Sequence, residues 1–144
     1  MAASNYFFRT CPWQGERNIV DILTDGSGYP SNTVHNRKDL AKDHGATVNA
    51  LITLDPNDPG LEQYCRNYLV TQPGDAGPGR PPVDTGFVET VATQMSSKNP
   101  GAVTQYQQDM TIAFRKKIFR EIAILRQDAR TMRQQSAPSR GLSL

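Results

Sequence analysis

The chain has few of the features that would place it in several large classes of protein. Its 144 residues include two cysteines, Cys11 and Cys65, and one tryptophan. Its apolar runs stay far below the roughly 20 residues of a membrane span, and two cysteines cannot make a disulfide framework or a metal site. The N-terminus lacks the charged start and apolar middle of a secretory signal. We therefore expect a reduced, cytosolic protein without metal, cofactor or membrane partner.

The sequence also lacks the motifs of the common enzyme classes. It contains no G-x-S-x-G elbow, phosphate-binding P-loop, dinucleotide fingerprint or H-E-x-x-H pair. The two histidines, His35 and His44, lie in a polar segment, where we expect both at the surface. These observations predict a protein that is not an enzyme.

Positive charge is scarce in most of the chain and concentrated at its C-terminal end. Residues 1–114 carry 8 basic and 12 acidic groups, a net charge of −4, whereas residues 115–144 carry 8 basic and 2 acidic groups, a net charge of +6. Such polarity indicates contact with an anionic partner or with another copy of the chain. A solvated basic helix face would give the same pattern.

The N-terminal third contains two segments with helical spacing. Residues 1–13 are rich in aromatics and suggest a strand or extended arm. Apolar residues at i, i+3 and i+4 in residues 15–25 predict a helix, and residues 33–44 predict a second, mostly polar helix. A short turn between them would make an antiparallel helix pair.

The middle of the chain alternates between regular segments and breakers. Residues 46–54 are β-branched and apolar and predict a strand or extended segment, and residues 60–70 predict a helix. The next segment, 71–84, has four prolines and three glycines and predicts a long loop. Residues 86–98 are compatible with either a strand or a helix.

A single long helix is the clearest element in the sequence. Its apolar residues recur at a period close to 3.6 and fall at positions 103, 106, 110, 114, 118, 122, 125, 129 and 132. A helix of about 30 residues would be roughly 45 Å long, so we expect an elongated single domain over 1–134 and a flexible tail over 135–144. The seam of Phe114, Ile118, Ile122 and Leu125 is the predicted core face of this helix.

The polar surface of this helix is strongly basic. Two carboxylates, Glu121 and Asp128, interrupt a set of cations formed by Arg115, Lys116, Lys117, Arg120, Arg126, Arg130 and Arg133. Cations without neutralising neighbours can approach a phosphate backbone. The pattern therefore fits nucleic acid, although solvated helices share it.

Three pieces of the sequence resemble the coat proteins of rod-shaped plant viruses of the tobacco mosaic virus type. An aromatic segment, NYFFRTCPW, leads through Leu23–Thr24 to Arg37, with a step of 24 residues from Trp13 to Arg37. The segment DMTIAFR at 109–115 resembles the D-x-T-x-A-x-R that opens the longest helix of that family. The turn Asn99–Pro100 precedes this helix. The matching stretches cover residues 5–45 and 87–130.

The resemblance implies a mainly α protein, an elongated antiparallel four-helix bundle with short strands or extended segments. It implies a virion protein of the host cytoplasm that forms a helical homopolymer around single-stranded genomic RNA, with little sequence preference. Residues that the resemblance assigns to RNA binding are Arg37, Arg80, Asp109, Ile112, Ala113, Arg115 and Lys116. It also places Glu89 and Asp109 among carboxylates between subunits, where mutual repulsion would raise each pKa.

Each assignment has an ordinary alternative. Arg37 could be a surface arginine, Glu89 a solvated side chain, and Asp109 a charge that compensates the helix N-terminus. Ile112 and Ala113 could be core residues rather than a platform for bases. For the whole protein, the alternative to an RNA coat is a helical adaptor or a bacteriophage neck or tail protein that does not bind nucleic acid.

Overall fold

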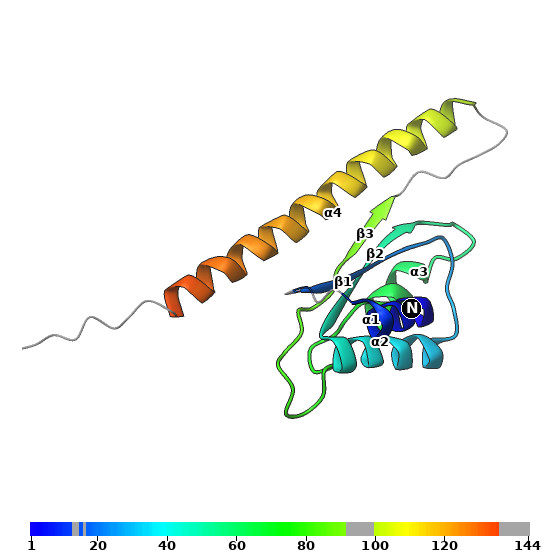
Figure 1. Ribbon diagram of the computed structural model, residues 1–144. Helices are drawn as coiled ribbons and strands as arrows, with labels where there is room; N and C mark the ends of the chain where they lie inside the picture. Colours follow the sequence, from blue (N-terminus) through cyan, green and yellow to red (C-terminus); the bar gives the residue numbers. More distant parts are fainter. Residues whose placement is uncertain (13–14, 16, 92–99, 136–144) are drawn as a thin grey trace, which may run out of the picture.

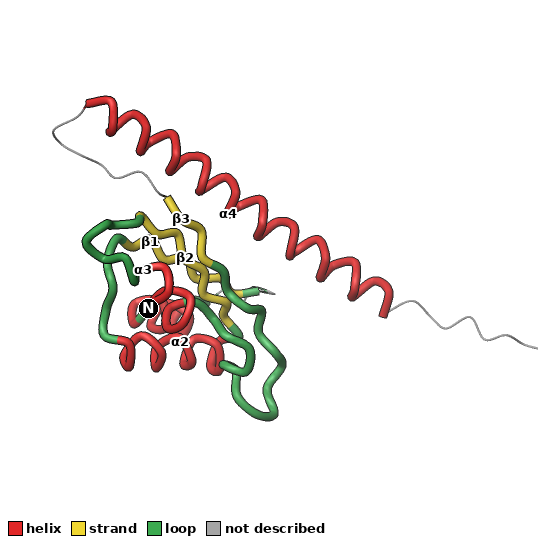
Figure 2. The backbone as a smooth tube through the Cα atoms, turned by 180° about the vertical axis from the view of Figure 1, so that it is seen from behind, coloured by secondary structure: helices red, strands yellow, loops and turns green. Residues whose placement is uncertain are grey.

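A computed structural model describes residues 1–12, 15, 17–91 and 100–135. A three-stranded parallel sheet separates two layers of helices (Figure 1). In chain order the elements are α1 (Ala2–Thr10), β1 (Asn18–Thr24), α2 (Pro30–His44), β2 (Ala46–Thr53), α3 (Leu61–Tyr64), η1 (Cys65–Leu69), β3 (Val88–Val91) and α4 (Pro100–Gln135). The short N-terminal helices lie on one face of the sheet, and α4 crosses the other face and runs past it (Figures 1 and 2).

This architecture contradicts the predicted fold class. The chain is not an antiparallel four-helix bundle, because three of its segments pair as a sheet in the order β1-β2-β3. The connections from β1 to β2 and from β2 to β3 are crossovers that carry α2 and then α3 with η1. Parallel strands require such crossovers, which place helices over the sheet.

Residues 15–25, predicted as a helix, contain strand β1 instead. Val20 and Ile22 point to the layer of short helices, whereas Asp21 lies on the face toward α4. β1 pairs along its full length with β2, with Val20 beside Val48. The β-branched residues Ile19, Val20 and Ile22 are compatible with the helical spacing and also favour a strand, and the neighbouring strand decides between them.

The N-terminal arm also differs from its prediction. Ala2–Thr10 forms helix α1, which packs on α2, and not a strand or extended segment. Phe8 of this helix and Met1, which precedes it, contact the apolar cluster around Val20 and Leu40. An amphipathic helix buries those side chains without a strand partner. Trp13 lies outside the described residues.

Several other predicted segments are confirmed. α2 and β2 occupy the segments predicted as a polar helix and a strand, and α3 with η1 occupies the predicted helix of 60–70. The Pro- and Gly-rich segment 71–84 contains no helix or strand. The ambiguous segment 86–98 contributes β3, and its remainder after residue 91 lies outside the described residues. Beyond Gln135, the predicted tail also lies outside them.

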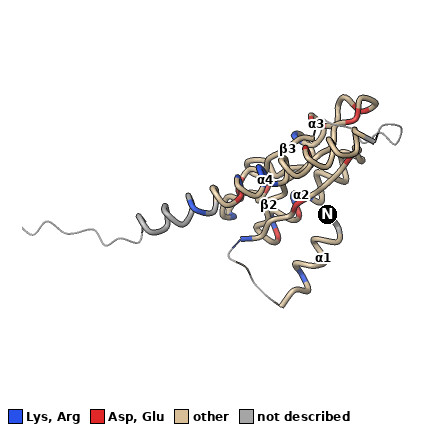
Figure 3. The backbone as a smooth tube through the Cα atoms, turned by 90° about the horizontal axis from the view of Figure 1, so that it is seen from above, with Lys and Arg blue, Asp and Glu red and all other residues tan. Residues whose placement is uncertain are grey.

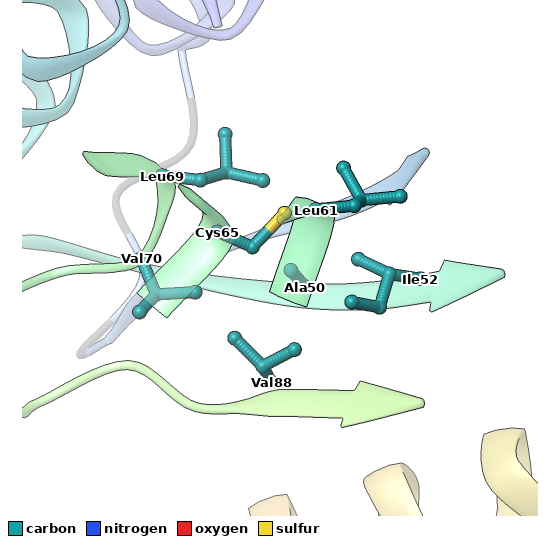
Figure 4. Close-up of a cluster of buried hydrophobic side chains, with 7 residues drawn as sticks. All are labelled: Ala50, Ile52, Leu61, Cys65, Leu69, Val70 and Val88. Atoms are coloured by element: carbon teal, nitrogen blue, oxygen red, sulfur yellow. The ribbon is translucent and has the colours of Figure 1, made fainter. Parts of the chain in front are cut away.

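The main core lies between the sheet and the short helices. β2 is its centre, with residues 46–52 all buried, because this strand is covered on both faces. The largest apolar cluster joins β2 and β3 to α3 and η1, and its side chains converge in Figure 4: Ala50, Ile52, Leu61, Cys65, Leu69, Val70 and Val88. Burial, followed by the carboxylates of Asp58 and Glu62, raises the pKa of the Cys65 thiol to about 11.

The long helix is confirmed, but its predicted core seam is not buried. Phe114 and Ile122 are 48% and 38% exposed, and the side chain of Leu125 lies outside the described residues. The helix instead packs Ala113 against Leu51 and Val91, with Tyr106 and Met110 beside them.

The geometry of the α-helix explains this difference. Steps of four residues advance about 40° beyond a full turn of the helix. The apolar line through 106, 110, 114, 118 and 122 therefore winds away from the sheet.

Candidate nucleic-acid interface

Five residues on one side of α4 form a basic, partly apolar surface, which we call the outer face. They follow the helical spacing i, i+3 or i+4, i+7 and i+14, so they share one side of the helix. The outer face consists of Ile112, Arg115, Lys116, Phe119 and Arg126. Figure 3 shows the basic positions along α4.

The outer face is open to solvent. Phe119 is 71% exposed and Ile112 is 50% exposed, and Arg115, Lys116 and Arg126 are exposed as well. Phe119 leaves a phenyl ring exposed to water among cations. Exposed apolar surface of this kind can mark a binding site. Such a ring can stack on a base, while the cations contact phosphates.

A shallow hollow continues this surface toward the N-terminal end of α4. It is lined by Thr104, Gln107, Gln108, Thr111, Ile112 and Arg115. The Thr111 hydroxyl donates to the Gln107 carbonyl at 2.8 Å, which holds that side chain against the helix. Both glutamine amides are exposed, and an amide can donate to and accept from base edges. The hollow therefore adds hydrogen-bonding groups next to the cations.

The opposite side of α4 uses its charges inside the subunit. Lys117 is completely buried, and its ammonium is paired with the carboxylates of Asp21 and Glu121. Glu121 also accepts a hydrogen bond from Asn49 at 3.0 Å. A buried lysine requires such partners, so Lys117 does not belong to the basic surface predicted from the sequence.

Arg120 lies between the two sides of the helix. Its guanidinium stands 4.3 Å from the centroid of the Phe87 ring and 3.7 Å from the Glu89 carboxylate. The arginine side chain is 53% exposed, so this cation is partly available to a ligand. Its contact with Phe87 is a cation–π interaction, which helps to fix α4 over β3.

Arg37 lies in the interior and not on a surface. Its side chain is 5% exposed and its Nε atom lies 2.7 Å from Asp75 Oδ2. The guanidinium also donates to Asp75 Oδ1 and to the Asn67 carbonyl, each at 3.0 Å. The Asp75 carboxylate already occupies the side of the guanidinium that would hold a phosphate. Arg37 is also separated from the outer face of α4 by the sheet.

The other predicted site residues are divided between several places. Arg80 is exposed in the loop between η1 and β3, and Ala113 is buried against Leu51. Asp109 accepts a hydrogen bond from Gln105 at 2.8 Å. Glu89 faces Arg120 of the same chain, and its role between subunits stays a prediction. Of the residues that the resemblance assigns to RNA binding, the structure therefore brings Ile112, Arg115 and Lys116 together on the outer face.

Phe119 is a surface residue that the sequence patterns did not single out. Its position falls outside the apolar line 114, 118, 122. An aromatic residue outside that line is the feature of the sequence that could have indicated an exposed ring. An aromatic residue that breaks the helical stripe of its own helix faces away from that stripe. Combined with its neighbours Arg115 and Lys116, it defines the centre of the outer face.

Comparisons with family models, with curated proteins and with solved structures find no match to this chain. Within the described part of the chain, groups of three or more metal-ligating side chains are absent. The same residues include no helix with both the length and the apolar character needed to cross a membrane.

Proposed function

We propose that the protein is a structural protein that binds single-stranded RNA along the outer face of α4 and packages it as a homo-oligomer. The observation that carries the proposal is the exposed Phe119 ring among the exposed cations Arg115, Lys116 and Arg126. The resemblance to rod-shaped virus coat proteins supports it, since DMTIAFR lies on α4. The four-helix bundle of that family is not part of the proposal.

The chemistry of the outer face suits binding without sequence preference. Lysine and arginine neutralise phosphates whatever the base, and a phenyl ring stacks on any base because every base has a π-face. A protein that coats a whole genome needs this tolerance. Arg37 is omitted from the proposed surface because Asp75 already pairs with it.

The test is the affinity for a fluorescent single-stranded RNA as a function of salt. Three exposed cations predict a slope of about −2 in log affinity against log salt, at about −0.7 per phosphate on a single strand. Lys116→Ala should make this slope shallower by about 0.7. Phe119→Ala should weaken binding by about 1–3 kcal/mol with the slope unchanged, because stacking releases no counterion.

Lys38→Ala provides the matched control. Lys38 is also exposed but lies on α2, across the sheet from α4. This variant should bind RNA with the affinity and slope of the wild type. A salt-independent affinity, or equal losses in Lys38→Ala and Lys116→Ala, would remove the outer face from the proposal.

A second candidate function is a helical adaptor that does not bind nucleic acid. The exposed apolar side chains of α4, Phe114 and Ile122, favour it because they offer a surface for another protein. The same RNA titration separates the two candidates, since an adaptor would leave the RNA free at low salt.

A further inference from the structure

α4 carries two different stripes, and the sheet covers one of them. The covered stripe contains Tyr106, Met110, Ala113 and Lys117. From Tyr106 to Ile122 the apolar line takes four steps of four residues, which rotates it about 160° around the helix. This rotation leaves Ile122 38% exposed. The helix backbone continues past the sheet to Gln135 (Figures 1 and 2).

The spacing changes where the apolar line leaves the sheet. From residue 118 onward the intervals alternate between four and three and give a mean of 3.5 residues. These apolar positions, which we call the distal seam, are Ile118, Ile122, Leu125, Ala129 and Met132. An alternation of four and three holds a stripe on one side of the helix and is the repeat of a two-helix coiled coil. The sequence therefore keeps an apolar seam where the sheet no longer lies beneath it.

The charged residues beside the distal seam select its partner. With Ile122 at heptad position a, the e positions are Phe119, Arg126 and Arg133 and the g positions are Glu121 and Asp128. In a parallel pair of identical helices, each g residue meets the e residue five positions later on the partner. Glu121 then meets Arg126 and Asp128 meets Arg133, so both charged pairs are attractive.

The antiparallel arrangement would reverse this complementarity. It brings e positions together and g positions together, so arginine would face arginine and carboxylate would face carboxylate. Glu121 already accepts hydrogen bonds from Lys117 and Asn49 inside the subunit. The partner that fits both the seam and its charges is a second copy of this chain.

We propose that two copies of this protein associate through the distal seam as a parallel, two-stranded coiled coil. The seam lies roughly 120° around α4 from the sheet-facing stripe, so the sheet of each copy does not lie between the two helices. Two residues of the outer face, Phe119 and Arg126, are at e positions, so the outer face borders the distal seam along α4. The proposed dimer specifies one contact between copies in the proposed homo-oligomer. Its formation does not require RNA.

The first test compares two adjacent substitutions on the same turn. Ile122→Lys places an ammonium in the distal seam, whereas Ala123→Lys places the same charge at the neighbouring exposed position outside it. In sedimentation equilibrium of RNA-free protein, wild type and Ala123→Lys should dimerise alike. Ile122→Lys should raise the dimer dissociation constant by at least about tenfold, because the seam would bury an ammonium. Unchanged circular dichroism verifies that each variant is folded.

Two results would overturn the proposal. One is a wild type that stays monomeric across the concentration series. The other is an equal dimer affinity in Ile122→Lys and Ala123→Lys. Neither result bears on RNA binding, which is measured separately through Lys116 and Phe119.

The second test establishes the orientation by disulfide cross-linking. In a Cys11→Ser background, Met132→Cys should form a cross-linked dimer under mild oxidation, because a parallel pair places residue 132 beside residue 132. Cys65 is buried and its thiol has a raised pKa of about 11, so it does not compete. An antiparallel pair would separate the two 132 positions by about 21 Å along the helix. Cross-linking that requires Ile118→Cys together with Met132→Cys would overturn the parallel arrangement.

Discussion

At the scale of single residues, Arg37 and Asp75 form a buried ion pair that joins α2 to the loop after η1. Asp75 also accepts a hydrogen bond from the backbone N–H of Gln72 at 2.7 Å. The pair therefore holds one end of the long Pro- and Gly-rich segment in place. Both side chains are almost fully withdrawn from solvent, at 5% and 3% exposure, so the loss of one partner leaves an uncompensated charge in the interior.

We predict that Arg37→Ala lowers the free energy of unfolding by about 3–5 kcal/mol, because Asp75 would remain buried without its cation. Urea denaturation followed by circular dichroism measures the loss. Replacing both partners, Arg37→Met with Asp75→Leu, should recover most of it, since a well-packed apolar pair can substitute for a buried ion pair. A loss below about 1 kcal/mol in Arg37→Ala would show that the pair is not closed in solution.

Gly86 lies where the chain returns to the sheet before β3. Its N–H donates to the Thr71 carbonyl at 2.9 Å, and the Thr71 N–H donates to the Val48 carbonyl at 3.2 Å. A Cβ atom at residue 86 would overlap the Val48 carbonyl oxygen and press on the Thr71 nitrogen. These are backbone atoms, so they cannot move aside as a flexible side chain would.

Gly86→Ala should therefore destabilise the fold by about 1–3 kcal/mol or more, as overpacking does in a core. Gly26→Ala is the matched control, because a Cβ atom there meets nothing within 4 Å. Thermal unfolding of the two variants beside the wild type measures the difference. Equal midpoints for both variants would contradict the close approach at Gly86.

At the scale of elements, α4 contributes to the fold through a short part of its length. Its packing on the sheet combines a small apolar patch, Leu51 with Val91 and Ala113, and polar contacts on both sides of that patch. Tyr106 and Thr53 are hydrogen-bonding partners at 3.2 Å, and Asn49 donates to Glu121.

A substitution beneath the covered part of α4 and one in the distal seam should differ in their effect on the free energy of unfolding. Leu51→Ala should lower the free energy of unfolding by about 2–5 kcal/mol, because the side chain is 2% exposed and its removal leaves a cavity. Ile122→Ala should cost about 1 kcal/mol or less, since its side chain is already partly in water. Urea denaturation should be carried out at a protein concentration below the dimer dissociation constant. Equal losses would show that the distal seam is part of the subunit core.

At the scale of the whole molecule, charge is separated along the chain. Residues 1–114 have a net charge of −4 and residues 115–144 a net charge of +6. α4 carries seven of the 16 lysines and arginines of the chain. Lys117 and Arg120 are paired with carboxylates of the subunit, whereas Arg115, Lys116 and Arg126 are exposed. A long basic helix projecting from an acidic body can meet an anionic polymer with little repulsion.

Packaging predicts a property that simple RNA binding does not have. Genomic-length single-stranded RNA mixed with the protein should become resistant to nuclease in proportion to the protein added, and negative-stain microscopy should show extended particles. A variant lacking outer-face charge, Arg115→Ala with Lys116→Ala, should protect less RNA because fewer phosphates are neutralised. Digestion at the rate of free RNA, with small oligomers in the micrographs, would favour the adaptor function.

The sequence by itself determined the elements whose local signals agree with one another. The long helix follows from a helical repeat without internal breakers, β2 from a β-branched apolar run, and the loop after η1 from its prolines and glycines. The exposure of Arg115 and Lys116 follows from the same helical repeat. In each case neighbouring residues alone set the preference, so no distant contact was required.

Only the tertiary structure decided the segments whose signals fit two conformations. Residues 18–24 satisfy both a helical and a strand pattern, and pairing with β2 made them a strand. Arg37 and Lys117 have polar neighbours in the sequence, yet Asp75 and Asp21 compensate them in the interior from distant parts of the chain. The sheet also divides α4 into a covered and an uncovered stripe, because a straight helix can present only one side to a surface.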